Sequence, residues 1–117
     1  MRRFVILEHD YPALHWDLML EAGGVLQTWR LANPPAPGSN SIAATALGDH
    51  RILYLDYEGP VSGNRGIVKR WDAGIFEEEP ASIPTARRLV LRGTRVIGRV
   101  CLEQIEGTSW RLVPLAA

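Results

Sequence analysis

The chain has 117 residues, of which 46% are hydrophobic and 22% charged, values typical of one globular domain rather than a disordered segment. Thirteen Lys and Arg residues balance thirteen Asp and Glu residues, so any contact with nucleic acid requires a local basic patch. The single cysteine, Cys101, excludes an internal disulfide and is expected to be buried. No signal peptide or membrane-length apolar run is visible, so a cytoplasmic monomer without membrane contact is expected.

Short strands dominate the predicted elements, and residues 1–117 are expected to form one domain. In chain order the strands are predicted at Phe4–Leu7, Leu14–Glu21, Val25–Leu31, Ile42–Leu47, Ile67–Trp71, Arg87–Leu91, Val96–Glu103 and Ser109–Val113. Turns are predicted at Ala22–Gly24, Asp72–Gly74, Arg92–Thr94 and Glu106–Thr108, and exposed loops at Asn33–Asn40, Gly59–Gly66 and Glu77–Pro84. This pattern is typical of a small antiparallel β-barrel or sandwich.

The strand Leu14–Glu21 carries the first candidate site. His15 and Asp17 are two residues apart, so their side chains share one face and begin roughly 6–7 Å apart. An imidazole and a carboxylate suit Mn²⁺, Zn²⁺ or Fe²⁺, and His9 is close enough along the chain to supply a third ligand. Three protein ligands would leave positions for water and substrate. His-x-Asp is a weak pattern, and ordinary polar residues on a solvated strand are the alternative interpretation.

A second candidate cluster contains Asp49, His50 and Tyr54. A spacing of four places His50 and Tyr54 about 13 Å apart on a strand, but about 6 Å apart on one helical turn. Only the turn lets both contact one small anion, and Asp49 is an acceptable N-cap for it. The alternative is that Tyr54 packs with its apolar neighbours and His50 is solvated. The tryptophans are expected in the core rather than as base-stacking platforms: Trp16, Trp29, Trp71 and Trp110.

Read together, these segments resemble the 3′-phosphoesterase domain of bacterial DNA ligase D over nearly the whole chain. The most specific block is the run from Phe4 to Asp10, followed by Leu14-His15-Trp16-Asp17-Leu18, Leu20-Glu21 and Gly24-Val25-Leu26 through Trp29. Asp49-His50, Tyr54, Tyr57-Glu58-Gly59, Gly63-Asn64 and Trp71-Asp72-Ala73-Gly74 follow in the family's order, and weaker matches continue through Leu89, Arg92-Gly93, Gly98, Leu102, Trp110 and Leu112.

The resemblance implies a small β-barrel with a short helical turn and a Mn²⁺-dependent site that trims nucleic-acid 3′ ends. Such domains remove a terminal ribonucleoside and then the 3′-phosphate, in DNA repair by non-homologous end joining, with ligase and polymerase proteins as partners. By position, His9, His15 and Asp17 match the metal ligands. His50 and Tyr54 match residues that engage the phosphate. Asp10 and Glu21 are expected to support the ligands.

The chain departs from the family at positions that are usually basic. The resemblance implies an arginine where this chain has Met19, a lysine where it has Asn33, and a basic residue where it has Ile42. Ser62 replaces a glutamate. A thioether cannot hold a phosphate as a guanidinium fork does. Three cationic side chains are therefore candidates to replace the missing contact: Arg65, Arg30 and Lys69.

Two hypotheses follow from this combination. In the first, the chain is a metal-dependent phosphoesterase in which His50 donates a proton or binds the phosphate and Tyr54 donates a hydrogen bond. In the second, it is a catalytically weak module that binds DNA ends or repair partners and keeps the metal. The first hypothesis is favoured by the retained residues His9, His15, Asp17, His50 and Tyr54. The second is favoured by Met19, Asn33 and Ile42 at usually basic positions.

Overall fold

The structure is a computed structural model that describes residues 1–36 and 40–116. The predicted irregular segment Asn33–Asn40 therefore lies partly outside the described residues; its described parts, residues 33–36 and 40, are neither helical nor extended into a strand. Within the described ranges no helix is long and apolar enough to cross a membrane.

Ten strands and one short 3₁₀ helix are found in the described ranges. They are β1 Arg2–His9, β2 His15–Ala22, β3 Val25–Leu31, β4 Ile42–Ala46, β5 His50–Arg51, η1 Ile52–Leu55, β6 Gly59–Pro60, β7 Ile67–Glu78, β8 Ala86–Arg92, β9 Ile97–Glu106 and β10 Ser109–Pro114. The two longest strands, β7 and β9, are longer than the sequence pattern indicates.

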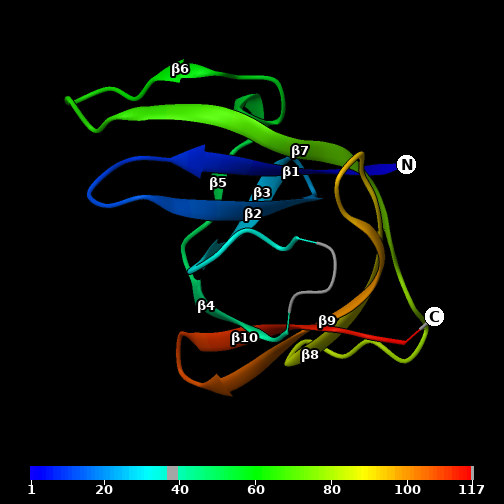
Figure 1. Cartoon of the computed structure of the whole chain (residues 1–117). Helices are drawn as coiled ribbons and strands as arrows, with labels where there is room; N and C mark the ends of the chain where they lie inside the picture. Colours follow the sequence, from blue (N-terminus) through cyan, green and yellow to red (C-terminus); the bar gives the residue numbers. More distant parts are fainter. Residues whose placement is uncertain (37–39, 117) are drawn as a thin grey trace.

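The strands close into an antiparallel barrel. Neighbouring strands follow the order β1-β2-β3-β4-β10-β9-β8-β7, and β1 pairs with β7 to complete the circle (Figure 1). The predicted barrel with one helical turn is therefore confirmed. Closure leaves few free strand edges, which protects a small β protein from edge-to-edge association.

The barrel interior holds the main hydrophobic core. Trp29 and Trp110 are buried in it and meet edge to face at 5.5 Å between ring centroids, and Trp16 and Trp71 pack against it. The prediction that the tryptophans belong to the core is confirmed for Trp29 and Trp110, whereas Trp16 and Trp71 are only partly buried. Cys101 is also buried, and burial raises the pKa of its thiol, so it is a weak nucleophile.

A second, smaller core lies on the outer face of the barrel. On β2, Leu18 and Leu20 belong to the interior core, whereas Met19 belongs to the outer one, as the predicted alternation requires. Val5 and Leu7 of β1 share this outer core with Leu55 of η1. The segment from β5 to β6 therefore covers one outer face of the barrel: β5 pairs with β3, and β6 runs beside β7 in Figure 1.

The predicted turn at Asp72-Ala73-Gly74 is wrong, because these residues lie within the continuous strand β7. Phe4 of β1 pairs with Gly74, so the chain cannot reverse there. The glycine serves close approach instead: a Cβ at Gly74 would lie 2.0 Å from the carbonyl oxygen of Arg92. Continuation of β7 to Glu78 also places the start of the predicted loop Glu77–Pro84 within the strand.

Asp72 ties β7 to the turn that joins β8 and β9. Its buried carboxylate accepts hydrogen bonds from the backbone N–H groups of Thr94 at 2.9 Å, Arg95 at 3.0 Å and Val96 at 2.8 Å. The Ala73 N–H donates a further bond at 2.9 Å. One side chain therefore satisfies four backbone donors, of which the bond from Val96 is buried and the other three are partly buried.

Asp72→Ala should lower the free energy of unfolding by about 3 kcal/mol or more, because each buried donor left unpaired costs about 1–3 kcal/mol. Urea unfolding followed by tryptophan fluorescence measures the change. Asp56→Ala is the matched control, since Asp56 forms an exposed ion pair with Arg3 at 2.6 Å, a kind of contact worth at most about 1 kcal/mol. Equal losses in the two variants would contradict this role of Asp72.

Candidate metal centre and adjoining cavity

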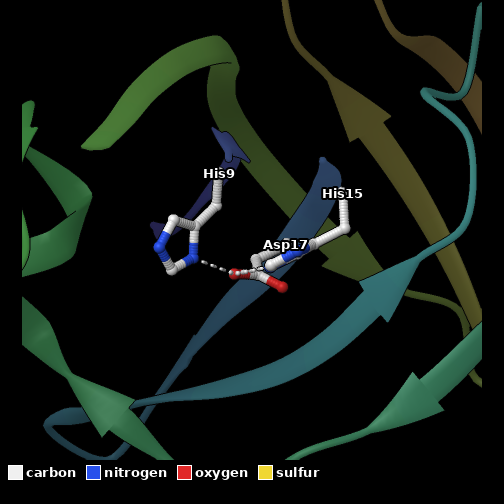
Figure 2. A group of neighbouring side chains, drawn as sticks. All are labelled: His9, His15 and Asp17. Atoms are coloured by element: carbon white, nitrogen blue, oxygen red, sulfur yellow. Dashed lines mark hydrogen bonds and ion pairs between the residues drawn. The ribbon is translucent and has the colours of Figure 1, made fainter. Parts of the chain in front are cut away.

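The hairpin of β1 and β2 brings three candidate ligands together. In the antiparallel register His9 lies opposite His15, and Leu7 lies opposite Asp17, so both histidines and the aspartate share the outer face of the barrel. Figure 2 shows the three side chains converging. One nitrogen from each histidine and one carboxylate oxygen of Asp17 all lie within 4.8 Å of one another.

Asp17 is the centre of this group. Its Oδ2 lies 3.2 Å from His15 Nε2 and 3.8 Å from His9 Nδ1. The residue is only 4% exposed. Its other oxygen, Oδ1, is buried and has no hydrogen-bond partner among the described residues. A buried carboxylate with an unpaired oxygen is costly unless a cation or a donor satisfies it.

Backbone carbonyls fix the tautomers of both histidines. His15 Nδ1 lies 2.9 Å from the Ala13 oxygen, and His9 Nε2 lies 2.8 Å from the Arg65 oxygen. A carbonyl only accepts, so each of these nitrogens carries the proton, and the other ring nitrogen of a neutral imidazole presents a lone pair. Both lone pairs face Oδ2 of Asp17, an arrangement that is stable when a cation or a proton lies between them.

This donor set fits a divalent transition metal. Metal-bound histidines commonly donate their second N–H to a backbone carbonyl, as both do here. Two imidazole nitrogens and a carboxylate oxygen suit Mn²⁺, Zn²⁺ or Fe²⁺. The role of the Ala13 and Arg65 carbonyls could not be predicted from the sequence, because any residue type supplies the same backbone oxygen.

The second cluster is close to its predicted form but is built differently. Tyr54 lies on the 3₁₀ helix η1, as predicted, whereas His50 precedes that helix on the short strand β5. The N-cap is Arg51 without a side-chain cap, so the predicted N-cap role of Asp49 is wrong. The rings of His50 and Tyr54 nevertheless lie 6.2 Å apart between centroids. His50 donates through Nδ1 to the Gly48 oxygen at 2.9 Å, which leaves Nε2 free of that bond.

One cavity of about 270 Å³ joins the two clusters. Its walls include His9 and Asp17 from the first cluster, and His50 and Tyr54 from the second. Its wall also includes Tyr11, Met19, Arg30 and Arg65. Met19 therefore faces the cavity, as the alternation on β2 predicts, and it is 2% exposed.

The remaining predicted site residues lie elsewhere. Asp10 accepts a hydrogen bond from the Ile67 N–H at 2.8 Å and so ties the end of β1 to β7 beside the cavity. Glu21 lies at the opposite end of β2 from His15 and accepts from the Arg3 N–H at 2.9 Å, so its expected support of the ligands is wrong. Lys69 is exposed and does not line the cavity. Ile42 points into the barrel core.

The chain is also similar to known proteins. A family model described as "DNA Ligase D 3'-phosphoesterase domain" matches residues 7–104. The chain is 32% identical over 122 residues to the "Multifunctional non-homologous end joining protein LigD" of Mycolicibacterium smegmatis, covering 92% of this chain and 16% of that protein. The "Multifunctional non-homologous end joining DNA repair protein LigD" of Mycobacterium tuberculosis H37Rv is 34% identical over 114 residues, covering 92% and 15%. The chain thus spans only a small part of each of these relatives.

Position 66 should be intolerant of a side chain, because Asp10 and Tyr11 fill the space beside it and the preceding Arg65 oxygen accepts the bond from His9. Its φ is +76°, and a Cβ there would lie 2.2 Å from Asp10 Oδ1 and 2.7 Å from Tyr11 Cβ. Gly63 is a matched control, with φ +74° and its nearest neighbour at 3.5 Å. Gly63→Ala should cost about 1–2 kcal/mol from backbone strain, and Gly66→Ala about 1–3 kcal/mol more from the collision.

Urea unfolding measures both costs, and ¹H–¹⁵N spectra of the histidine rings report whether His9 moves. The His9 signals should shift in Gly66→Ala and stay in place in Gly63→Ala. An unshifted His9 in a Gly66→Ala protein of unchanged stability would contradict the packing described above.

Proposed function

Because this chain belongs to the DNA ligase D 3′-phosphoesterase domain family, we propose that it is a metal-dependent phosphoesterase that processes nucleic-acid 3′ ends. One observation carries the proposal: a single cavity adjoins both the His9–His15–Asp17 cluster and the His50–Tyr54 pair. The reaction class is hydrolysis of a 3′-phosphate or of a 3′-ribonucleoside linkage. Both substrates present a phosphoryl group. A phosphoryl group is the chemical feature that the two clusters could bind together.

His9, His15 and Asp17 would hold the metal, with Mn²⁺ as the proposed ion. When bound, a divalent ion stabilises charge on phosphoryl oxygens and lowers the pKa of water. The buried, unpaired Oδ1 of Asp17 supports this assignment, since it has room for a further bond. The backbone carbonyls of Ala13 and Arg65 would keep the histidine lone pairs aimed at one point.

His50 and Tyr54 would act on the phosphoryl group from the covering segment. His50 is oriented by its Nδ1–H bond to Gly48, so its imidazolium form carries a second proton on Nε2 that it can donate to the leaving oxygen. The Tyr54 hydroxyl can donate a hydrogen bond to a phosphoryl oxygen. Tyr54 is fixed from its other side by Tyr57, whose ring lies 5.8 Å away between centroids. Ordered packing of this kind holds a donor in place before substrate arrives.

We place the activity in DNA repair because the relatives are named as end-joining repair proteins. Nucleic-acid 3′ ends are the proposed substrates, and ligase or polymerase proteins the proposed partners. The chain has no net charge to attract duplex DNA at long range, with 13 basic and 13 acidic residues. A substrate end recognised through its terminal phosphoryl group is consistent with this balance.

A second candidate function is a metal-holding module that binds ends or repair partners without efficient hydrolysis. Met19 favours it, because the apolar thioether occupies cavity wall beside the ligands and donates no hydrogen bond. Loss of one donor at a site of developing charge lowers rates by on the order of 10²–10³. The two candidates therefore differ in rate rather than in ligand set.

Two variants should affect Mn²⁺ binding and 3′-phosphate release differently. Asp17→Asn should weaken Mn²⁺ binding more than about 100-fold, beyond the range for loss of an outer-shell partner, and activity should fall with it. His50→Gln should keep the metal and lose about 10²–10⁴ in rate, the range for a positioned acid. Calorimetric titration with Mn²⁺ and a fluorescent 3′-phosphorylated oligonucleotide give the two readouts.

Glu106→Gln, which changes an exposed glutamate at the end of β9 that does not line the cavity, is the control and should behave as the unchanged protein. Mn²⁺ binding without phosphate release in the unchanged protein would favour the binding module. Absence of Mn²⁺ binding, or identical binding in Asp17→Asn, would contradict the proposed centre.

A further inference from the structure

Two guanidinium groups line the cavity, those of Arg65 and Arg30, and they differ in their hydrogen-bond partners. Arg65 is exposed, and its side chain donates to the Ser62 carbonyl oxygen at 2.7 Å and to Ser62 Oγ at 3.2 Å. Its backbone oxygen also receives the bond from His9. The Arg65 side chain is therefore hydrogen-bonded within its own loop, and its charge is exposed to water at the cavity rim.

Arg30 is in the opposite condition. Its Nε is buried and has no hydrogen-bond partner within the described part of the chain. In that same part no carboxylate lies within 4.0 Å of its guanidinium nitrogens. The side chain lines the cavity together with His50 and Tyr54. A guanidinium is always charged and carries five N–H donors in a rigid fork.

The strand register would allow an ion pair between Arg30 and Asp17, but the two side chains do not form one. Arg30 on β3 lies directly opposite Asp17 on β2, so the two side chains leave the same face of the sheet side by side. Opposite charges in that position normally pair. Here Asp17 instead turns its Oδ2 toward His9 and His15. The carboxylate is directed to the metal-ligand cluster, and the positive charge of Arg30 is left for another anion.

The groups around Arg30 point to the same conclusion. A buried donor on a charged group without a partner costs free energy, which an anion in the cavity would recover. Met19, also in the wall, can supply neither a charge nor a donor. His50 and Tyr54 supply neutral or positive donors rather than a competing carboxylate.

We propose that Arg30 is the residue that anchors the phosphoryl group in this chain, reaching the cavity from β3. The proposal rests on the proposed function for the identity of the anion. A terminal phosphoryl group held by the Arg30 fork lies in the same cavity as the ligand cluster and the His50–Tyr54 pair. Arg30 is thereby a substrate-binding residue that sets specificity for a tetrahedral oxyanion with at least two accessible oxygens.

The test measures binding of inorganic phosphate to the whole chain by calorimetry at constant ionic strength. Arg30→Met keeps an unbranched apolar side chain and removes the charge, and Arg30→Lys keeps a charge without the fork. Arg92→Met is the control, since Arg92 is exposed and lies 4.0 Å from Glu77. Arg30→Met should weaken phosphate binding by about 10- to 100-fold, the range for a lost bond to a charged group. The phosphate affinity of Arg30→Lys should lie between those of Arg30→Met and the unchanged protein. Arg92→Met should bind phosphate as tightly as the unchanged protein does.

A second readout excludes a structural role. In phosphate-free buffer the Tm of Arg30→Met should equal or exceed that of the unchanged protein, because no partner is lost. Phosphate should raise the Tm of the unchanged protein and not that of Arg30→Met. Unchanged phosphate affinity in Arg30→Met, or a large fall of its Tm without phosphate, would overturn the proposal. If Arg30→Met does not fold, equal affinity of Arg30→Lys and the unchanged protein overturns it.

Oligonucleotides identify the source of the phosphoryl group. Arg30→Met should weaken binding of a 3′-phosphorylated strand and leave a 3′-hydroxyl strand unaffected. An equal loss for both strands would overturn the assignment to a terminal phosphoryl group. Failure of the proposed function is recognised separately: the unchanged protein would then bind phosphate through Arg30 but release none from the 3′-phosphorylated strand with Mn²⁺. The converse result, activity that is insensitive to Arg30→Met, would sink the inference alone.

Discussion

The antiparallel register between β1 and β2 is the constraint on which the site depends. It places His9 opposite His15 and sets Asp17 on the same face, although five residues lie between the two histidines in the sequence. A shift by one residue would turn His15, Asp17 and Met19 into the barrel interior and bring Leu18 outward. The register is held because the interior core requires Leu18 and Leu20, and because β1 also pairs with β7. The same packing that stabilises the barrel therefore aligns the ligand cluster.

The outer face of the barrel becomes a site because another layer covers it. The segment from His50 to Gly66 packs through Leu55 against Val5 and Leu7, which leaves a cavity rather than an open sheet surface. Low exposure of Asp17 and Met19 follows from this cover. Burial strengthens electrostatic contacts in the cavity, so the unpaired Asp17 and Arg30 atoms have larger effects there than at an exposed surface.

Alternating hydrophobicity predicted the barrel and the two faces of β2, because side-chain alternation is a local property of an extended chain. It did not predict the full length of β7, because the glycine at position 74 suggests a turn. In the structure this glycine instead permits close approach to Arg92. The four-residue spacing brought His50 and Tyr54 together, but η1 begins after His50 and Asp49 does not cap it. The histidine tautomers and the unpaired state of Arg30 depend on backbone oxygens and cross-strand neighbours distant in sequence, which composition and spacing do not encode.

The central claim is that lone pairs from His9 and His15 converge on Asp17 because their N–H groups are bound to backbone carbonyls. Nitrogen-15 spectra of the histidine rings test it directly, since the chain contains only 3 histidines. On titration with Zn²⁺, we expect selective shifts of His9 Nδ1 and His15 Nε2. The protons should remain on His9 Nε2 and His15 Nδ1, and the ring nitrogens of His50 should change least. Shifts at the opposite ring nitrogens, or no response of either ring to the ion, would contradict the account.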